Sequence, residues 1–126
     1  MEFSSVQTDG IPPQIVILSL NISLTSDKES LITVRHQLTM TTGLDDNVAD
    51  NHSFLAQDLL YKQDAGTRWA YHNAPYTLLD QVVERATGQT LNTFVTQKLK
   101  NQIGMDGRFV TQDYNNIFFS TARSMA

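Results

Sequence analysis

The chain has 126 residues, a net charge of −4 and no cysteine. This length suits one domain. The acidic balance, without a cluster of Lys and Arg, argues against nucleic acid or an anionic membrane as the main partner. The lack of cysteine excludes disulfides and thiolate metal sites. No apolar run approaches the ~18 residues of a membrane span, and the N-terminus lacks the basic flank and cleavage site of a signal peptide, so localisation stays open.

The N-terminal segment, residues 1–30, begins irregularly, because Gly10 and the Pro12-Pro13 pair are breakers. Apolar and polar residues then alternate over residues 15–24. This alternation predicts a β-strand with one apolar face. An unpaired strand of this kind invites self-association, so we expect residues 15–24 to mediate any contact between copies of the chain.

Two short helices are predicted next. Thr33 suits the N-cap of a helix that continues to Met40, with Gly43 as its C-terminal stop. Ser53 suits the N-cap of a second helix over residues 54–62, which would bury Leu55 and Leu59. Residues 64–67, Asp-Ala-Gly-Thr, have the composition of a turn.

The clearest helical pattern covers residues 74–87, with Asn73 as its N-cap and Gly88 as its end. The spacing predicts one buried face made of Leu79, Val82, Val83 and Ala86.

Thr90 opens a further predicted helix, which Gly104 closes. We expect a loop over residues 105–117 and a last helix capped by Ser120. That helical pattern stops at the last residue, which is typical of an excised fragment.

Four stretches in a fixed order resemble the penicillin-recognising serine hydrolases: class C β-lactamases, DD-peptidases and related esterases. Residues 32–44 (ITVRHQLTMTTGL) are similar to the family's ITVRHLLTHTSGL, and residues 65–73 (AGTRWAYHN) to PGTRWxYSN. Residues 76–105 follow the pattern YxLLGxVIExxTGxSxxxFVxxxIxxPLGM, and residues 119–126 (FSTARSMA) resemble LxSTARDMA. The resemblance covers about residues 31–126 and leaves residues 1–30 as a divergent segment.

The resemblance implies a mainly α chain, the helical subdomain of a β-lactamase-like α+β fold, with a candidate N-terminal strand. It also implies acyl-enzyme chemistry on a β-lactam, a D-Ala-D-Ala peptide or a small ester, with a small-molecule or peptidoglycan-like substrate and no cofactor. Tyr71 and Asn73 match the family's Tyr-x-Asn pair, in which Tyr acts as base and Asn holds the substrate's amide. Members of the family are often periplasmic or secreted.

Other parts of the family's machinery are missing from the sequence. It contains no Ser-x-x-Lys motif and no Lys-Thr-Gly or His-x-Gly triplet. A free tyrosine has a pKa of about 10, and nearby lysines are what would stabilise a phenolate at neutral pH. We therefore expect a fragment that carries the Tyr-x-Asn pair and is inactive alone.

Each candidate residue also has a simpler interpretation. Tyr71 suits a structural tyrosine before a helix, and Asn73 suits an N-cap. His72 stands where the family has Ser; it could carry a proton, and the favoured interpretation is a tolerated substitution that points away from the nucleophile. We expect Trp69 to pack in the core and Arg68 to form a local salt bridge or to cap a carbonyl. The spacing of the three histidines predicts no metal site.

Two functions remain open from the sequence. One is the serine hydrolase fragment, and the other is a non-catalytic helical binding or self-assembly module derived from the same family. A helix-turn-helix DNA-binding protein is disfavoured, because there is no basic recognition helix.

Overall fold

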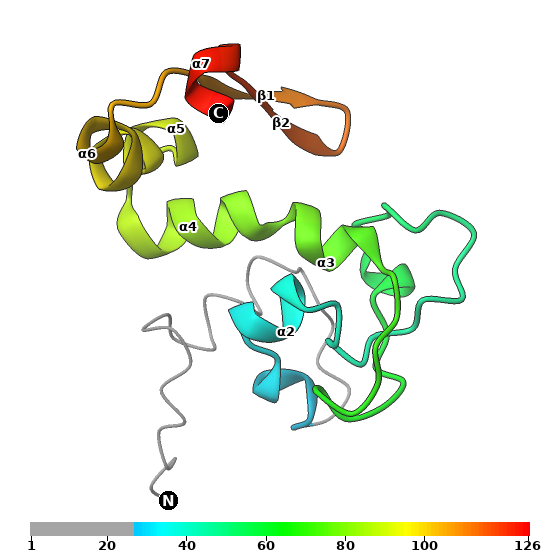
Figure 1. Cartoon of the computed structure of the whole chain (residues 1–126). Helices are drawn as coiled ribbons and strands as arrows, with labels where there is room; N and C mark the ends of the chain where they lie inside the picture. The colour runs from blue at the N-terminus through cyan, green and yellow to red at the C-terminus, as the bar shows by residue number, and fades with distance from the viewer. Residues whose placement is uncertain (1–26) are drawn as a thin grey trace, which may run out of the picture. The chain divides into compact units, whose positions relative to one another are not determined.

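The computed structural model describes residues 27–126, which divide into two compact units between Leu79 and Asp80 (Figure 1). The described elements of the first unit are η1 (Glu29–Leu31), α2 (Val34–Leu38), η2 (Ala56–Asp58) and α3 (Asn73–Thr77). The chain continues with α4 (Leu79–Thr87), α5 (Leu91–Val95), the π-helical turn η3 (Thr96–Lys100), α6 (Asn101–Ile103), β1 (Arg108–Gln112), β2 (Asn115–Phe119) and α7 (Ala122–Met125). The mainly helical prediction is confirmed for these residues, and the strand predicted over residues 15–24 lies outside them.

Helix α2 begins as the sequence predicts and ends earlier. The Thr33 hydroxyl accepts from the backbone N–H of His36 at 3.3 Å, and the His36 ring accepts from the Thr33 N–H at 3.2 Å, which makes a reciprocal capping box. The stop is Met40, whose φ is 55°, and the Thr41 N–H reaches back to the His36 carbonyl at 2.9 Å. This is the left-handed termination that glycine usually provides. The prediction of Gly43 as the stop is therefore wrong.

Gly43 has a different role, because another segment of backbone passes very close to it. Its φ is 77°, and a Cβ built on it would lie 2.1 Å from the Gln63 carbonyl oxygen. Its own carbonyl accepts from the N–H groups of Lys62 and Gln63, each at 3.0 Å. Leu44 then pairs with Tyr61 in an isolated antiparallel bridge. Backbone pairing with residues 61–63 thus fixes the conformation of Gly43 and Leu44, which lie outside any helix or strand.

The helix predicted over residues 54–62 is reduced to the short turn η2. The Ser53 hydroxyl donates to the Asp58 carboxylate at 2.5 Å, and the backbone beyond it joins the bridge at Tyr61. Leu59 is fully buried as predicted, whereas Leu55 is 60% exposed, so its predicted burial is wrong. The turn predicted over residues 64–67 is confirmed, with the Thr67 N–H bonded to the Asp64 carbonyl at 3.3 Å.

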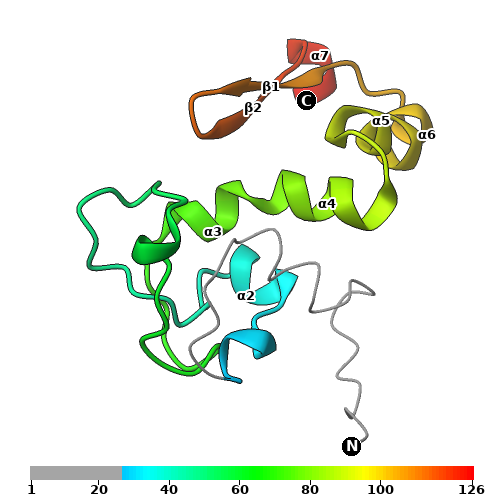
Figure 2. The same ribbon diagram turned by 180° about the vertical axis from the view of Figure 1, so that it is seen from behind.

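The core of the first unit gathers around α2 and α3, which lie side by side (Figure 2). The Gln37 side chain donates from Nε2 to the Pro75 carbonyl at 2.7 Å, so a buried polar bond joins the two helices. The buried residues of this unit include apolar Ile32, Leu44, Leu59, Ala74 and Leu78, and polar Glu29, Gln37, Thr42, Ser53 and His72.

The single helix predicted over residues 74–87 is divided into α3 and α4 by a turn at Leu78. Of the predicted buried face, Val82 is fully buried, Leu79 and Val83 are partly exposed and Ala86 is exposed. The 3.6-residue spacing correctly predicted that these residues are helical, but the predicted apolar face is less buried than expected.

The helix that begins after Thr90 ends at Gly104 as predicted. The Thr90 hydroxyl accepts from the Thr93 N–H at 3.2 Å, and Gly104 adopts φ 66° at the end of α6. Between them the helix widens into the π-helical turn η3, which the sequence pattern does not indicate.

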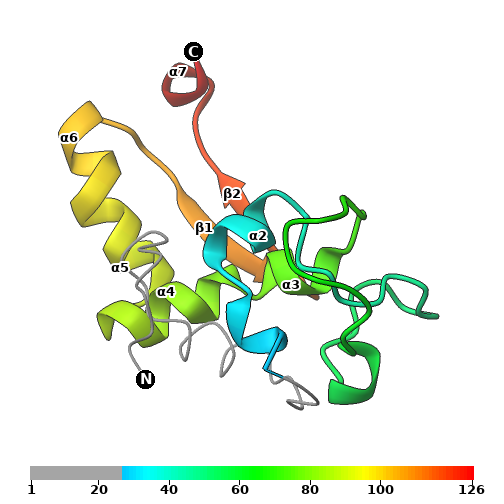
Figure 3. The same ribbon diagram turned by 90° about the horizontal axis from the view of Figure 1, so that it is seen from below.

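Residues 105–117 were expected to form a loop, and that prediction is wrong. They contain β1 and the start of β2, an antiparallel hairpin with Phe109 opposite Phe118 and Val110 opposite Ile117. The two phenylalanine rings lie 4.9 Å apart between centroids. Asp113, at φ 54°, supplies the tight turn without the glycine that usually marks one. The hairpin runs beside α5 (Figure 3), where the Asn92 side chain accepts from the Phe109 N–H at 2.7 Å and donates to its carbonyl at 2.9 Å.

The last helix, α7, is capped by Thr121, whose hydroxyl accepts from the Ser124 N–H at 3.3 Å. Ser120, the predicted cap, instead donates its hydroxyl to the Asp106 carbonyl at 2.5 Å. The residue used as the cap therefore differs by one position from the sequence prediction.

Candidate active site

Tyr71 and Asn73 lie directly before and at the start of α3. His72 between them is extended, with φ −135° and ψ 107°. In an extended backbone, alternate side chains point to opposite sides. Consistent with this, the Tyr71 side chain is 58% exposed and the His72 side chain is buried. The segment thus presents Tyr71 at the surface of the first unit, and the partly exposed Asn73 follows two positions later at the start of α3.

The backbone of this segment is held by Asn51, from the loop before η2. The Asn51 side chain donates from Nδ2 to the Tyr71 carbonyl at 2.9 Å and accepts at Oδ1 from the Asn73 N–H at 2.6 Å. The Asn51 carbonyl accepts from the Ala74 N–H at 3.0 Å. Asn73 is the first helical residue, and the N-cap position belongs to His72, whose side chain makes no cap bond. The prediction of Asn73 as N-cap is therefore wrong, and Asn51 supplies the missing acceptor.

His72 is 4% exposed, and no protein group bonds to either of its ring nitrogens. Burial lowers the pKa of His72 from its ordinary value, because the charged imidazolium loses its hydration. The carboxylates of Asp46 and Asp45 oppose that shift in the pKa. The net effect is a lowered pKa, which favours the neutral imidazole relative to a solvent-exposed histidine.

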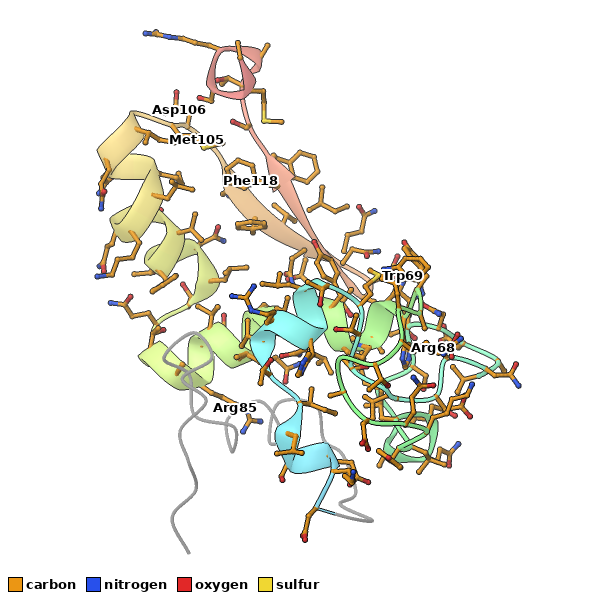
Figure 4. The ribbon with its side chains drawn as sticks, turned by 60° about the horizontal axis from the view of Figure 1, so that its bottom comes forward. Arg68, Trp69, Arg85, Met105, Asp106 and Phe118 are labelled. Atoms are coloured by element: carbon orange, nitrogen blue, oxygen red, sulfur yellow. The ribbon has the colours of Figure 1, made fainter. Side chains whose placement is uncertain are left out.

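Charged side chains flank the segment upstream. Arg68 bonds to both carboxylate oxygens of Asp46, at 2.7 and 3.2 Å, which confirms the local salt bridge expected of it. This guanidinium holds the pKa of the Asp46 carboxyl well below its usual range. Trp69, drawn near Arg68 in Figure 4, is 64% exposed, so its predicted place in the core is wrong. An exposed Trp and an exposed Tyr thus stand two positions apart on one segment.

Other features of the described residues add no competing centre. A shallow depression of about 270 Å³ on the second unit is lined by Asn92, Thr93, Thr96 and Gln97, none of which carries a charge or a strong nucleophile. Within residues 27–126, His, Asp and Glu side chains form no group of three that could hold a metal ion. In the same residues, no helix has both the length and the apolar character needed to cross a bilayer.

The family comparison decides the classification. The family model described as Beta-lactamase matches residues 14–122, most of the chain. The chain belongs to the beta-lactamase family. A comparison with curated proteins finds no match. The matched range begins upstream of residue 31, where the motifs that resemble the family begin, and includes both Tyr71 and Asn73.

Within this beta-lactamase-family chain, the two residues that the sequence singled out lie two positions apart on one segment. The structure adds Asn51, which bonds to the backbone of that segment, lies outside the motif stretches and was missed by sequence reasoning. The available signal was weak, since an asparagine in a polar loop is most often a turn residue. Only the folded chain shows that its side chain reaches residues 71 and 73.

Proposed function

We propose that the chain forms the Tyr-x-Asn wall of a serine hydrolase active site. In that site Tyr71 acts as the base near the nucleophile, and Asn73 bonds the substrate's amide. The substrate would be a β-lactam, a D-Ala-D-Ala peptide or a small ester, and the reaction would pass through an acyl-enzyme. The observation that carries the proposal is the exposed Tyr71 ring on a backbone fixed at both ends by Asn51.

The chemical requirements explain why the pair suits this role. A serine hydroxyl becomes a good nucleophile when an adjacent base removes its proton, so that base must stand at an accessible surface. An asparagine offers a donor and an acceptor to an amide at the same time. The 126 residues contain no Ser-x-x-Lys motif, so we propose that this chain alone contributes binding groups and no nucleophile.

Titration of the isotopically labelled chain with a penicillin, followed by nuclear magnetic resonance, tests the site. We expect the largest shifts at the Tyr71 ring and the Asn73 side-chain amide, and their loss in Tyr71→Phe. Tyr114→Phe, at a tyrosine that is 44% exposed in the second unit, is the matched control and should respond like the wild type. A titration that leaves Tyr71 and Asn73 unchanged would contradict the proposal.

Intact-mass measurement after incubation with a penicillin-type acylating probe tests the chemistry. Without an activated serine, the chain should carry no covalent adduct. A stoichiometric adduct would show that a serine in this chain is activated without the expected lysine, and would overturn the proposed lack of a nucleophile.

A non-catalytic binding or self-assembly module is the second candidate. It is favoured by exposed apolar side chains on the second unit, where Ile103 is 62%, Phe119 55% and Met125 70% exposed. Large apolar side chains that stay exposed on a folded unit are a feature of contact surfaces. Light scattering and the penicillin titration distinguish the candidates. The measured mass of a self-assembly module rises with protein concentration, and its resonances do not change when the penicillin is added. The self-association expected through residues 15–24 is part of this second proposal.

A further inference from the structure

Asn51 makes three hydrogen bonds to a segment that begins 20 positions later in the chain. Its side chain bonds to the Tyr71 carbonyl and the Asn73 N–H, and its carbonyl bonds to the Ala74 N–H. We propose that Asn51 is a positioning residue for Tyr71 and Asn73, which sets the direction of both side chains without touching the substrate itself. This inference rests on the proposed function of those two residues.

The side chain of Asn51 is well suited to that role. A carboxamide has its donor and acceptor in one rigid plane, so its two bonds fix two peptide groups relative to each other. Here they fix the peptide groups on either side of His72, at 2.9 Å and 2.6 Å. Neither aspartate, which lacks the donor, nor alanine, which lacks both groups, reproduces the pair of bonds.

Among residues 27–126, no other side chain caps this segment. The first N–H groups of a helix have no partner within the helix and need an outside acceptor. The His72 side chain makes no cap bond to α3, and both of its ring nitrogens are buried without a protein partner. Asn51 therefore provides the acceptors for the N–H groups of both Asn73 and Ala74.

Asn51 is itself ordered by its neighbours. The Asp50 carboxylate accepts from the His52 N–H at 3.0 Å, and the Asp50 carbonyl accepts from the Ser53 N–H at 3.0 Å. These bonds form a turn around Asn51, so less conformational freedom is lost when its side chain bonds to Tyr71 and Asn73. The turn thus holds the side-chain amide of Asn51 in position to bond to Tyr71 and Asn73.

Amide hydrogen exchange on Asn51→Ala tests this inference. Because one hydrogen bond contributes about 1 kcal/mol, we expect exchange at Asn73 to become about fivefold faster. The Ala74 N–H should be less affected, because its acceptor is the backbone carbonyl of residue 51, which the substitution retains. The Tyr71 ring resonances should shift, while the Gly66 amide, bonded to the Thr41 carbonyl at 2.7 Å, keeps its wild-type exchange. Asn47→Ala, at an exposed asparagine of the same loop, is the control and should change none of these.

Asn51→Asp separates the two side-chain bonds. The carboxylate retains an acceptor for Asn73, so slow exchange at that amide should return, while the Tyr71 ring remains shifted because the donor is lost. Wild-type exchange at Asn73 in Asn51→Ala would overturn the inference. An equal acceleration at Gly66 would also overturn it, because it would reveal general destabilisation of the unit.

The penicillin titration distinguishes a failure of this inference from a failure of the proposed function. If wild-type Tyr71 responds to the penicillin, Asn51→Ala should weaken the response severalfold, and an undiminished response would overturn the inference. If the wild type does not respond at all, the proposed function fails, and with it the positioning role that rests on it. The exchange data would then still report whether the Asn51 side chain bonds to this segment.

Discussion

The two units of this chain differ in two respects: how much regular secondary structure they contain, and how many of their residues are buried. Residues 27–79 contain short helices and long irregular stretches, yet all of the buried residues in the described part of the chain except Val82 lie there. Residues 80–126 are mostly helix and hairpin, yet large apolar side chains such as Ile103 and Phe119 are exposed. Local regularity and a buried core therefore do not depend on each other in this molecule.

The candidate active site belongs to the irregular, well-buried unit. Tyr71 is held by bonds from a loop and lies next to the buried His72, and the backbone around it has few partners in regular ladders. A site of this kind depends on tertiary contacts. Substitutions in the first unit should consequently cost more free energy of unfolding than matched ones in the second, and this comparison can be tested from the largest effect downward.

Leu59→Ala should be the most damaging of these substitutions. Leu59 is fully buried, and removing such a leucine costs about 2–5 kcal/mol in lost burial and a residual cavity. Leu99→Ala in the second unit, where the side chain is 48% exposed, should cost less than half as much. Urea unfolding of both variants measures the difference, and equal losses would refute the contrast between the units.

Gly43→Ala should follow, at about 2–3 kcal/mol, because it combines a left-handed backbone with a backbone clash. The new Cβ would meet the Gln63 carbonyl oxygen at 2.1 Å. Gly88→Ala is the matched control, with φ 69° and no atom within 4 Å of the new Cβ, so only the backbone strain of about 1–2 kcal/mol remains. Thermal unfolding of the pair isolates the effect of the close approach.

His72 should make the first unit sensitive to pH. Its pKa is lowered by burial from 6.5, so the unfolded chain binds a proton more readily than the folded one. The stability is full above about pH 6.5 and falls as the pH drops below that value. His72→Met should flatten the curve of stability against pH.

The remaining slope in His72→Met reports His36, whose pKa burial also lowers. Denaturant titrations between neutral and mildly acidic pH provide the curve. If His72→Met leaves the slope of stability against pH unchanged, His72 is not the source of that slope.

Thr90→Ala should have the smallest effect, up to about 1 kcal/mol, because it removes one exposed N-cap bond. Thr33→Ala removes a partly buried capping box and should cost more than Thr90→Ala. Circular dichroism during denaturation compares the two. The reverse order would show that the caps do not follow the contrast between the units.

The sequence predicted those features that depend on neighbours in the chain. Thr33 and Thr90 begin helices, and Gly104 ends one, because caps and left-handed stops act within one turn. The ordered motifs identified the family, and the family comparison supports that classification. The roles of Tyr71 and Asn73 were expected from the same motifs and remain proposals.

The sequence did not predict the features that depend on pairing with residues outside the local segment. The hairpin of β1 and β2 turns at Asp113 without a typical turn glycine, and its register depends on cross-strand pairs such as Phe109 with Phe118. The predicted helix over residues 54–62 yields to pairing between Tyr61 and Leu44. In both places a partner outside the local window decided the conformation.

The sequence by itself therefore determined the family, the mainly helical class and the helix starts at Thr33 and Thr90, since these follow from local residue order and short-range bonds. The tertiary structure alone decided that Gly43 meets the Gln63 backbone, that His72 is buried and that Asn51 holds the backbone of Tyr71 and Asn73. The physical reason is range, because burial and hydrogen bonding between distant segments arise only when the chain has folded.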